Sequence, residues 1–149
     1  MKKFFLAAMA LCLTFAFASC NKQKELAGTS WTAELQQSET MVEEGAEYLV
    51  GLDGTITLNF TDETNGETLM DVDISINGMT LMDMQDTTAF TYTFDGTNGT
   101  FSSKDEETGE IETQAFTYDK ESNTITMTET DTDENGETQT YTFIFKENL

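Results

Sequence analysis

The chain has no arginine, no histidine and no proline, and its two cysteines are Cys12 and Cys20. Without histidine it lacks the common general base near neutral pH and the commonest metal ligand. From residue 21 onward it also has no thiol nucleophile and no means of forming a disulfide. A pair of carboxylates, as in glycosidases, is the catalytic alternative that this composition leaves open, but no spacing singles out such a pair. We therefore expect a protein that is not an enzyme and needs no cofactor.

Positive charge is also scarce. Seven Lys stand against 28 acidic residues, which gives a formal net charge of −21. Nucleic-acid binding depends on Lys and Arg to neutralise phosphates, so this balance excludes nucleic acid as a partner class. The acidity is typical of a solvated, self-repelling surface, and it attracts cations or basic partners.

What the chain does have at its start is a segment typical of a secretory signal. Two lysines follow Met1, residues 4–17 are apolar, and the small residues Ala18 and Ser19 precede Cys20. The apolar run is too short to span a bilayer as a helix, which favours an export signal over a membrane anchor. Cys12 lies within this signal.

The end of the signal resembles the lipobox of bacterial lipoproteins. In that class the cysteine at the position of Cys20 is acylated and becomes the first residue of the mature protein. The resemblance implies a membrane partner through a lipid on Cys20 and a cell-envelope location as an outer-membrane lipoprotein, with the periplasmic or surface face left open. The alternative is an ordinary cleaved signal in which Cys20 is incidental. We expect residues 1–20 to be the signal, 21–27 a linker and 28–149 one folded domain.

From residue 28 onward the sequence alternates apolar and polar residues with period two. Apolar or aromatic side chains recur at every second position, with Thr or Asp between them, in 55–61, 70–76, 90–94, 116–118, 125–127 and 141–145. This alternation is typical of β-strands with one dry and one wet face, as in antiparallel sheets. The fold class that we expect is all-β.

Short acidic turns separate these stretches. Turns are expected at 51–54, 64–67, 77–78, 95–99, 107–110 and 134–137, where Asn-Gly, Asp-Gly or another glycine pairing supplies the positive φ of tight hairpins. Residues 37–45 fit no strand pattern and are expected to form either a short helix around Met41 or an acidic loop. Such close spacing makes sequence neighbours sheet neighbours, so we expect an antiparallel up-and-down meander of about eight to nine strands. Closing it into a barrel removes sticky sheet edges.

Several stretches carry a family resemblance. Gly28-Thr29-Ser30-Trp31 resembles the first strand of the lipocalin-like small lipoproteins common in Bacteroidetes, and residues 92–101, 123–127 and 141–145 resemble the hairpins of that family. The resemblance implies a lipocalin-like (calycin-like) β-barrel of eight or more strands, with Trp31 near its closed end and an apolar interior.

Two candidate sites follow from these observations. An interior apolar ligand site is one reading of the aromatic residues Trp31, Tyr92, Phe94, Phe116, Tyr118 and Phe143; the other reading is that they fill the core. A calcium site is one reading of Asp131, Asp133 and Asn135, which match the first half of an EF-hand loop. Against it, position 142, where the closing glutamate belongs, is Thr142. A solvated acidic hairpin is the other reading.

Three function classes remain at this point. The first, which we expect, is an exported, membrane-anchored binding or interaction module, with a small apolar ligand as one option. The alternative is a structural envelope lipoprotein with a filled core and protein partners only. A carboxylate hydrolase is the third. An open apolar pocket favours the first class, an exposed apolar patch the second, and two carboxylates across a cleft the third.

Overall fold

The computed structural model describes residues 22, 25–43, 45–105, 108–132, 136 and 138–149. Eight strands follow one another along the chain: β1 (Ser30–Glu43), β2 (Ala46–Phe60), β3 (Asn65–Ile76), β4 (Met79–Phe94), β5 (Asn98–Lys104), β6 (Ile111–Asp119), β7 (Thr124–Thr132) and β8 (Thr138–Glu147). Each strand pairs antiparallel with the next, and β8 pairs with β1 to close a barrel. The expected all-β, antiparallel up-and-down barrel is confirmed.

The hairpin turns form where the sequence supplies the required backbone conformations. In the two-residue turn between β3 and β4, Asn77 has φ 51° and Gly78 has φ 79°, the positive values that tight hairpins need. Between β2 and β3, the Asp62 carboxylate accepts hydrogen bonds from the backbone nitrogens of Thr64 and Asn65, both at 2.8 Å. Asp95 caps the turn between β4 and β5 in the same way, through Asn98 at 2.7 Å. Aspartates and asparagines therefore fix these turns by local hydrogen bonds.

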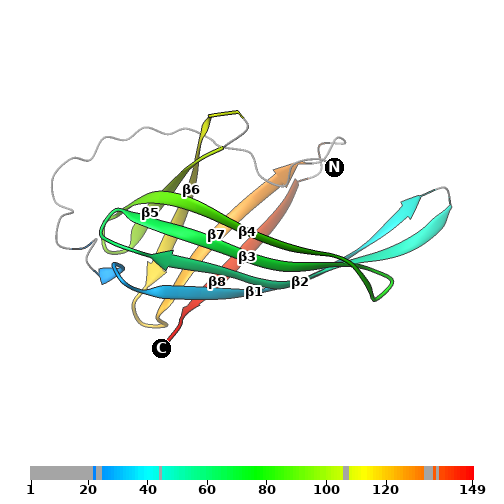
Figure 1. The fold of residues 1–149 in the computed structure, drawn as a ribbon, viewed down its shortest axis with the longest axis horizontal. Coiled ribbons are helices and arrows are strands. Elements are labelled where there is room, and N and C mark those ends of the chain that lie inside the picture. The colour runs from blue at the N-terminus through cyan, green and yellow to red at the C-terminus, as the bar shows by residue number, and fades with distance from the viewer. Residues whose placement is uncertain (1–21, 23–24, 44, 106–107, 133–135, 137) are drawn as a thin grey trace.

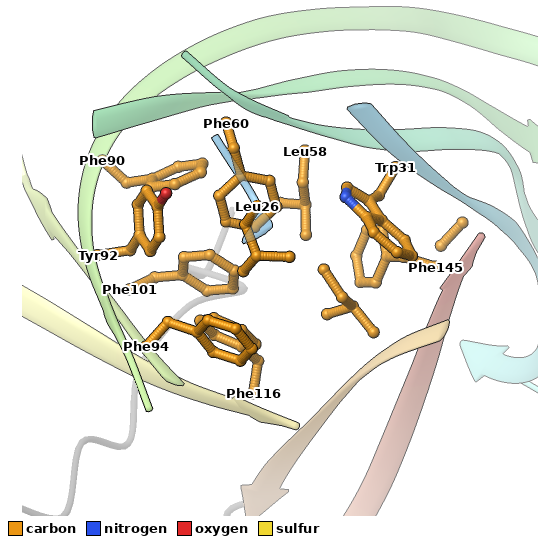
Figure 2. Close-up of a cluster of buried hydrophobic side chains, with 12 residues drawn as sticks. Leu26, Trp31, Leu58, Phe60, Phe90, Tyr92, Phe94, Phe101, Phe116 and Phe145 are labelled. Carbon is orange, nitrogen blue, oxygen red and sulfur yellow. The ribbon is translucent and has the colours of Figure 1, made fainter. Parts of the chain in front are cut away.

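One aromatic core fills the closed part of the barrel (Figure 2). Phe101 stacks on Phe116 with ring centroids 4.3 Å apart, and Phe60 meets Tyr92 edge to face at 4.8 Å. Ile125 is fully buried and Phe60 is 1% exposed. Offset-stacked and edge-to-face contacts are the favourable geometries for aromatic pairs, so these rings hold the strands together across the barrel.

The barrel is closed over only part of its length. β1 pairs with β8 at two positions, Trp31↔Glu147 and Thr32↔Lys146, and β6 pairs with β7 over Phe116–Asp119 alone. β1 to β4 have 12 to 16 residues, whereas β5 to β8 have 7 to 10. Figure 1 shows the consequence, since the first four strands extend to the right, past the ends of the others.

We call this extension the overhang. It comprises Leu35–Glu43 of β1, Ala46–Gly54 of β2, Val72–Ile76 of β3 and Met79–Met84 of β4, which pair as one four-stranded sheet. The hairpin of β1 and β2 projects beyond β3 and β4, because Val50 is the last β2 residue that pairs with β3.

Two local predictions were wrong. Residues 37–43 form neither a helix nor a loop but continue β1, paired with β2 as far as Glu43↔Ala46. Residues 51–54 form no turn and lie inside β2. A Cβ on Gly54 would lie 2.1 Å from the Asp71 carbonyl oxygen. This glycine therefore serves a close approach between strands and not a chain reversal.

Candidate binding surface on the overhanging sheet

The structure gathers the six predicted interior residues in the closed part of the barrel. Trp31, Tyr92, Phe94 and Phe116 are buried, and Tyr118 and Phe143 are half-buried and pack against them. Phe94 stacks on Phe116 with centroids 5.9 Å apart, and Trp31 meets Tyr118 edge to face at 5.7 Å. These side chains contact one another as a packed core; a ligand role for them stays a prediction.

A short plug seals the closed end. Leu26, in the segment expected to be a linker, is 1% exposed and lies among the aromatic rings (Figure 2). The Thr29 hydroxyl donates to the Leu26 carbonyl oxygen at 2.6 Å and accepts the indole N–H of Trp31 at 2.7 Å. Gly28 N–H donates to the Phe60 carbonyl oxygen at 2.7 Å. The chain before β1 is therefore tied to the base of the barrel.

The core places one tyrosine hydroxyl against an acidic turn. Tyr92 donates to the Asp62 carbonyl oxygen at 2.7 Å. Burial raises the pKa of Tyr92 to about 12, and the charges of Asp62 and Glu63 act in the same direction. Hydrogen bonds from Thr64 and Asn65 lower the pKa of Asp62 to about 2. These shifts accompany turn-fixing contacts and involve no opposed carboxylate or nucleophile.

Most residues of the two remaining sequence predictions lie outside the described residues. Cys20, Asp133 and Asn135 are among them. Asp131 belongs to β7, opposite Gln139 of β8, and the calcium site stays a prediction. Within the described parts of the chain, no group of three or more Cys, Asp or Glu is placed to hold a metal ion.

Exposed apolar side chains concentrate on the overhang. Of the twelve large apolar side chains left exposed among the described residues, eight lie there: Met41, Val42, Tyr48, Leu49, Met79, Leu81, Met82 and Met84. The register aligns Leu35, Gly54, Val72 and Met84 in one cross-strand row, and Gln37, Leu52, Ile74 and Met82 in the next. These rows continue the face that is buried inside the barrel, because side chains two positions apart share a face. The overhang therefore carries the barrel's apolar lining out to where no strand faces it among the described residues.

The opposite face of the overhang carries a row of aspartates. Asp53, Asp73 and Asp83 stand directly opposite one another on β2, β3 and β4. Like charges at directly opposite positions destabilise a sheet. Between Lys24 and Lys104 the sequence has no basic residue at all, so the overhang has no cation of its own to offset this repulsion.

The edge of β4 is open. Its pairing with β5 begins at Phe90↔Ser103, and no described residue pairs with Met79–Ala89 on the side away from β3. All of Met79–Ala89 is exposed. An apolar groove of about 330 Å³ lies where β4 and β5 part, lined by residues that include Phe90, Ser103 and Ile111. A second groove of about 510 Å³ on the overhang is lined mainly by polar residues such as Gln36, Asp53 and Ser75.

The strand patterns in the sequence do not include residues 79–89, so they do not predict the overhang. A usable signal was present. Residues 79–89 contain no glycine, proline or asparagine, and Met82, Met84 and Asp86 alternate with Asp83, Gln85 and Thr87. A segment without turn residues beside a strong Asn-Gly turn favours a long strand.

Compared with known proteins, the chain matches no family model, no curated protein and no solved structure. The lipocalin-like resemblance is therefore supported by topology, an eight-stranded antiparallel barrel, and not by a sequence relative. In the described part of the chain there is no helix of the length and apolar character that crossing a bilayer requires.

Proposed function

We propose that the protein is an interaction module that binds a partner through the apolar face and open edge of its overhang. One observation carries this proposal: the overhang extends the barrel's apolar face into solvent, and the exposed apolar side chains on that face are Met41, Tyr48, Met79, Met82 and Met84. Contiguous exposed apolar surface is rare on monomers and marks binding sites. A filled aromatic core beside such a surface favours a macromolecular partner over a small ligand held inside the barrel.

The proposal includes the expected lipid on Cys20, which would orient this surface. Lys22 lies against Gly96 in the turn between β4 and β5, at the closed end of the barrel, and the overhang points the other way (Figure 1). A chain anchored at Cys20 would present its overhang away from the membrane. The net negative charge supports this orientation, because anionic lipid repels an acidic domain.

A small apolar ligand is the second candidate, and the methionines favour it. Met79, Met82 and Met84 line the inner face near the β4 edge, and flexible methionine side chains adapt to ligands of varied shape. The two candidates can be told apart by the mass of the molecule that contacts the inner face, which is protein-sized for the first and a few hundred daltons for the second.

Site-specific photocrosslinking tests the proposal. The full chain carries benzoylphenylalanine in place of Met84, on the inner face, or of Thr117, on the exposed outer face of β6, and is irradiated in the cells that make it. We expect a discrete protein-sized adduct from position 84 and none from position 117. An adduct of a few hundred daltons at position 84 alone would support the small ligand. No adduct at position 84, or the same adducts at both positions, would refute a binding role for the overhang.

A further inference from the structure

We propose that the partner contributes a cationic, alternating strand that adds to the open edge of β4, next to Met82, Asp83 and Met84. This inference rests on the proposed binding role of the overhang and names the chemistry and geometry of what it binds. Three independent observations carry it: the direction of the β4 backbone groups, the apolar inner face, and the unbalanced charge of the outer face.

The backbone of β4 has hydrogen-bonding groups directed at solvent. The Tyr92 N–H donates to the Thr64 carbonyl oxygen at 2.8 Å, on the β3 side. Successive residues of a strand direct their backbone groups to opposite sides. From Asp83 to Thr91 the register with β3 runs without a break. The N–H and C=O groups of Asp83, Gln85 and Thr87 therefore point away from β3, where an added strand can pair with them.

The two faces of the overhang determine which types of side chain the added strand needs on each of its own faces. On the inner face, an added residue beside Met82 or Met84 contacts methionines that are 43% and 37% exposed, which favours an apolar residue. On the outer face, the neighbouring residue meets Asp83, with Asp73 directly across β3. A Lys or Arg there places opposite charges side by side, which stabilises a cross-strand pair. A strand that alternates basic and apolar residues satisfies both faces.

The charge pattern excludes two other occupants. A second copy of this chain would set one overhang without basic residues against another, and anionic lipid would meet the same aspartates. Both juxtapositions are repulsive. The lysine nearest this edge among the described residues, Lys104, does not change this, because it lies just past Phe90↔Ser103 on the side of Ala89, six positions along β4 from Asp83.

Synthetic peptides test the inference on the folded mature chain. The probe is the capped peptide Lys-Val-Lys-Val-Lys-Val-Lys, with Glu-Val-Glu-Val-Glu-Val-Glu as its charge-reversed control. Binding is measured by calorimetry. We expect saturable one-to-one binding of the Lys peptide that weakens at high ionic strength, because screening reduces the attraction, and at least about tenfold weaker binding of the Glu peptide.

Backbone methylation separates strand addition from simple charge attraction. One version of the Lys peptide carries a methyl group on the backbone nitrogen of every lysine. The other carries it on the backbone nitrogen of every valine. In an added strand only one of these sets faces β4, so one version should lose about tenfold or more in affinity while the other keeps it. If the version methylated at the lysines is the one that loses affinity, the peptide adds antiparallel to β4. Equal affinities of the two versions would overturn strand addition.

Two protein variants complete the test. Thr87→Pro removes an edge-directed N–H and spares the β3 pairing, so it should fold as the parent does by circular dichroism and lose peptide affinity. Asp83→Asn with Asp73→Asn should reduce the preference for Lys over Glu. Unchanged affinity in Thr87→Pro, or no binding of the Lys peptide to the parent, overturns the inference. If the peptide tests fail but benzoylphenylalanine at position 84 still crosslinks to a protein, the overhang binds a partner and only the cationic strand is rejected.

Discussion

At the residue scale, glycines and aspartates carry out specific tasks in this barrel. A Cβ on Gly99 would lie 2.0 Å from the Phe116 ring, and one on Gly66 would lie 2.4 Å from the Phe90 ring. Each glycine therefore leaves room above itself for an aromatic ring from the neighbouring strand, a packing known to stabilise glycines in sheets. The same two hairpins share the sequence Asp-x-Thr-Asn-Gly, at 62–66 and 95–99, so turn chemistry and ring packing recur together.

Substituting Gly99 tests this packing. We expect Gly99→Ala to lower the free energy of unfolding by roughly 1–3 kcal/mol, because the added methyl group forces the Phe116 ring to move within a filled core. Urea denaturation measures the change. Combining the substitution with Phe116→Leu should make the effect of the alanine smaller than it is alone. An undiminished effect in the double variant would mean that the clash is not with this ring.

The lowered pKa of Asp62 predicts that the stability of the fold depends on pH in the acidic range. Its folded pKa of about 2 lies below the ordinary 3.8, so the carboxylate stabilises the fold above about pH 4, and this contribution is lost as the pH falls through about 2. Asp62→Ala should therefore be less stable than the parent at neutral pH, with a difference that shrinks as the pH falls toward 2. Thermal melts at several pH values check this. A difference that stays constant between pH 7 and pH 2 would contradict it.

The raised pKa of Tyr92 predicts a pH dependence of stability in the alkaline range. Its pKa of about 12 lies above the ordinary 10, so the protonated phenol contributes stability below about pH 10 that is lost as the pH rises through about 12. We expect Tyr92→Phe to remove a component near pH 12 from the absorbance titration of the tyrosines. The variant should also lose about 1 kcal/mol at pH 7, through the bond to the Asp62 carbonyl oxygen. An unchanged titration above pH 11 would mean that Tyr92 is not the group that titrates near pH 12.

At the scale of elements, the barrel is held by a short seam. Beyond the two pairs of β1 and β8, Asn148 N–H donates to the Ser30 carbonyl oxygen at 2.8 Å, and its side-chain amide donates to the hydroxyls of Ser30 and Thr32, both at 2.9 Å. A single asparagine after the last strand thus joins the end of β8 to the start of β1.

Asn148→Ala tests the seam. We expect the loss of about 1–2 kcal/mol of stability, because two side-chain hydrogen bonds disappear. Deleting the fully exposed Leu149 is the matched control and should change little. Equal stability of Asn148→Ala and the parent in urea would mean that closure does not depend on this residue.

The fold was predictable from the sequence because strand period and turn chemistry are local. Period-two alternation at 55–61 and 90–94, with Asn-Gly at 77–78, gave the correct hairpins. Strand length was not predictable in the same way. Gly51 and Gly54 imitate a turn, although a Cβ at either position would instead meet β3, at the Ser75 hydroxyl for Gly51 and at the Asp71 carbonyl oxygen for Gly54. Neither the half-open barrel nor the overhang shows until the registers of all eight strands are known, because each depends on pairings between distant segments.

At the scale of the whole molecule, charge and shape are divided between two parts. The closed part holds the aromatic core and the end of the chain that leads to Cys20, while the overhang combines an apolar face, an acidic face and an open edge. Such an edge invites pairing between chains. Here the net charge of −21 opposes it, so the same acidity that keeps copies apart selects for basic partners.

This charge predicts a salt dependence of stability. Raising NaCl from low concentration to about 0.5 M should raise the melting temperature, because screening weakens repulsion among the acidic residues. Chloride is the appropriate salt, since sulfate strengthens apolar burial by itself. A melting temperature that falls as NaCl rises would mean that attractive charge pairs dominate.

Residue-resolved amide hydrogen exchange along β4 tests the open edge, and with it the central claim, most directly. In the free protein, the amides of Asp83, Gln85 and Thr87 should exchange fast, and those of Met84, Asp86 and Thr88, which face β3, should exchange slowly. That alternation is the predicted result. Slow exchange at all six positions would show that the edge is already covered and would contradict an overhang open to a partner.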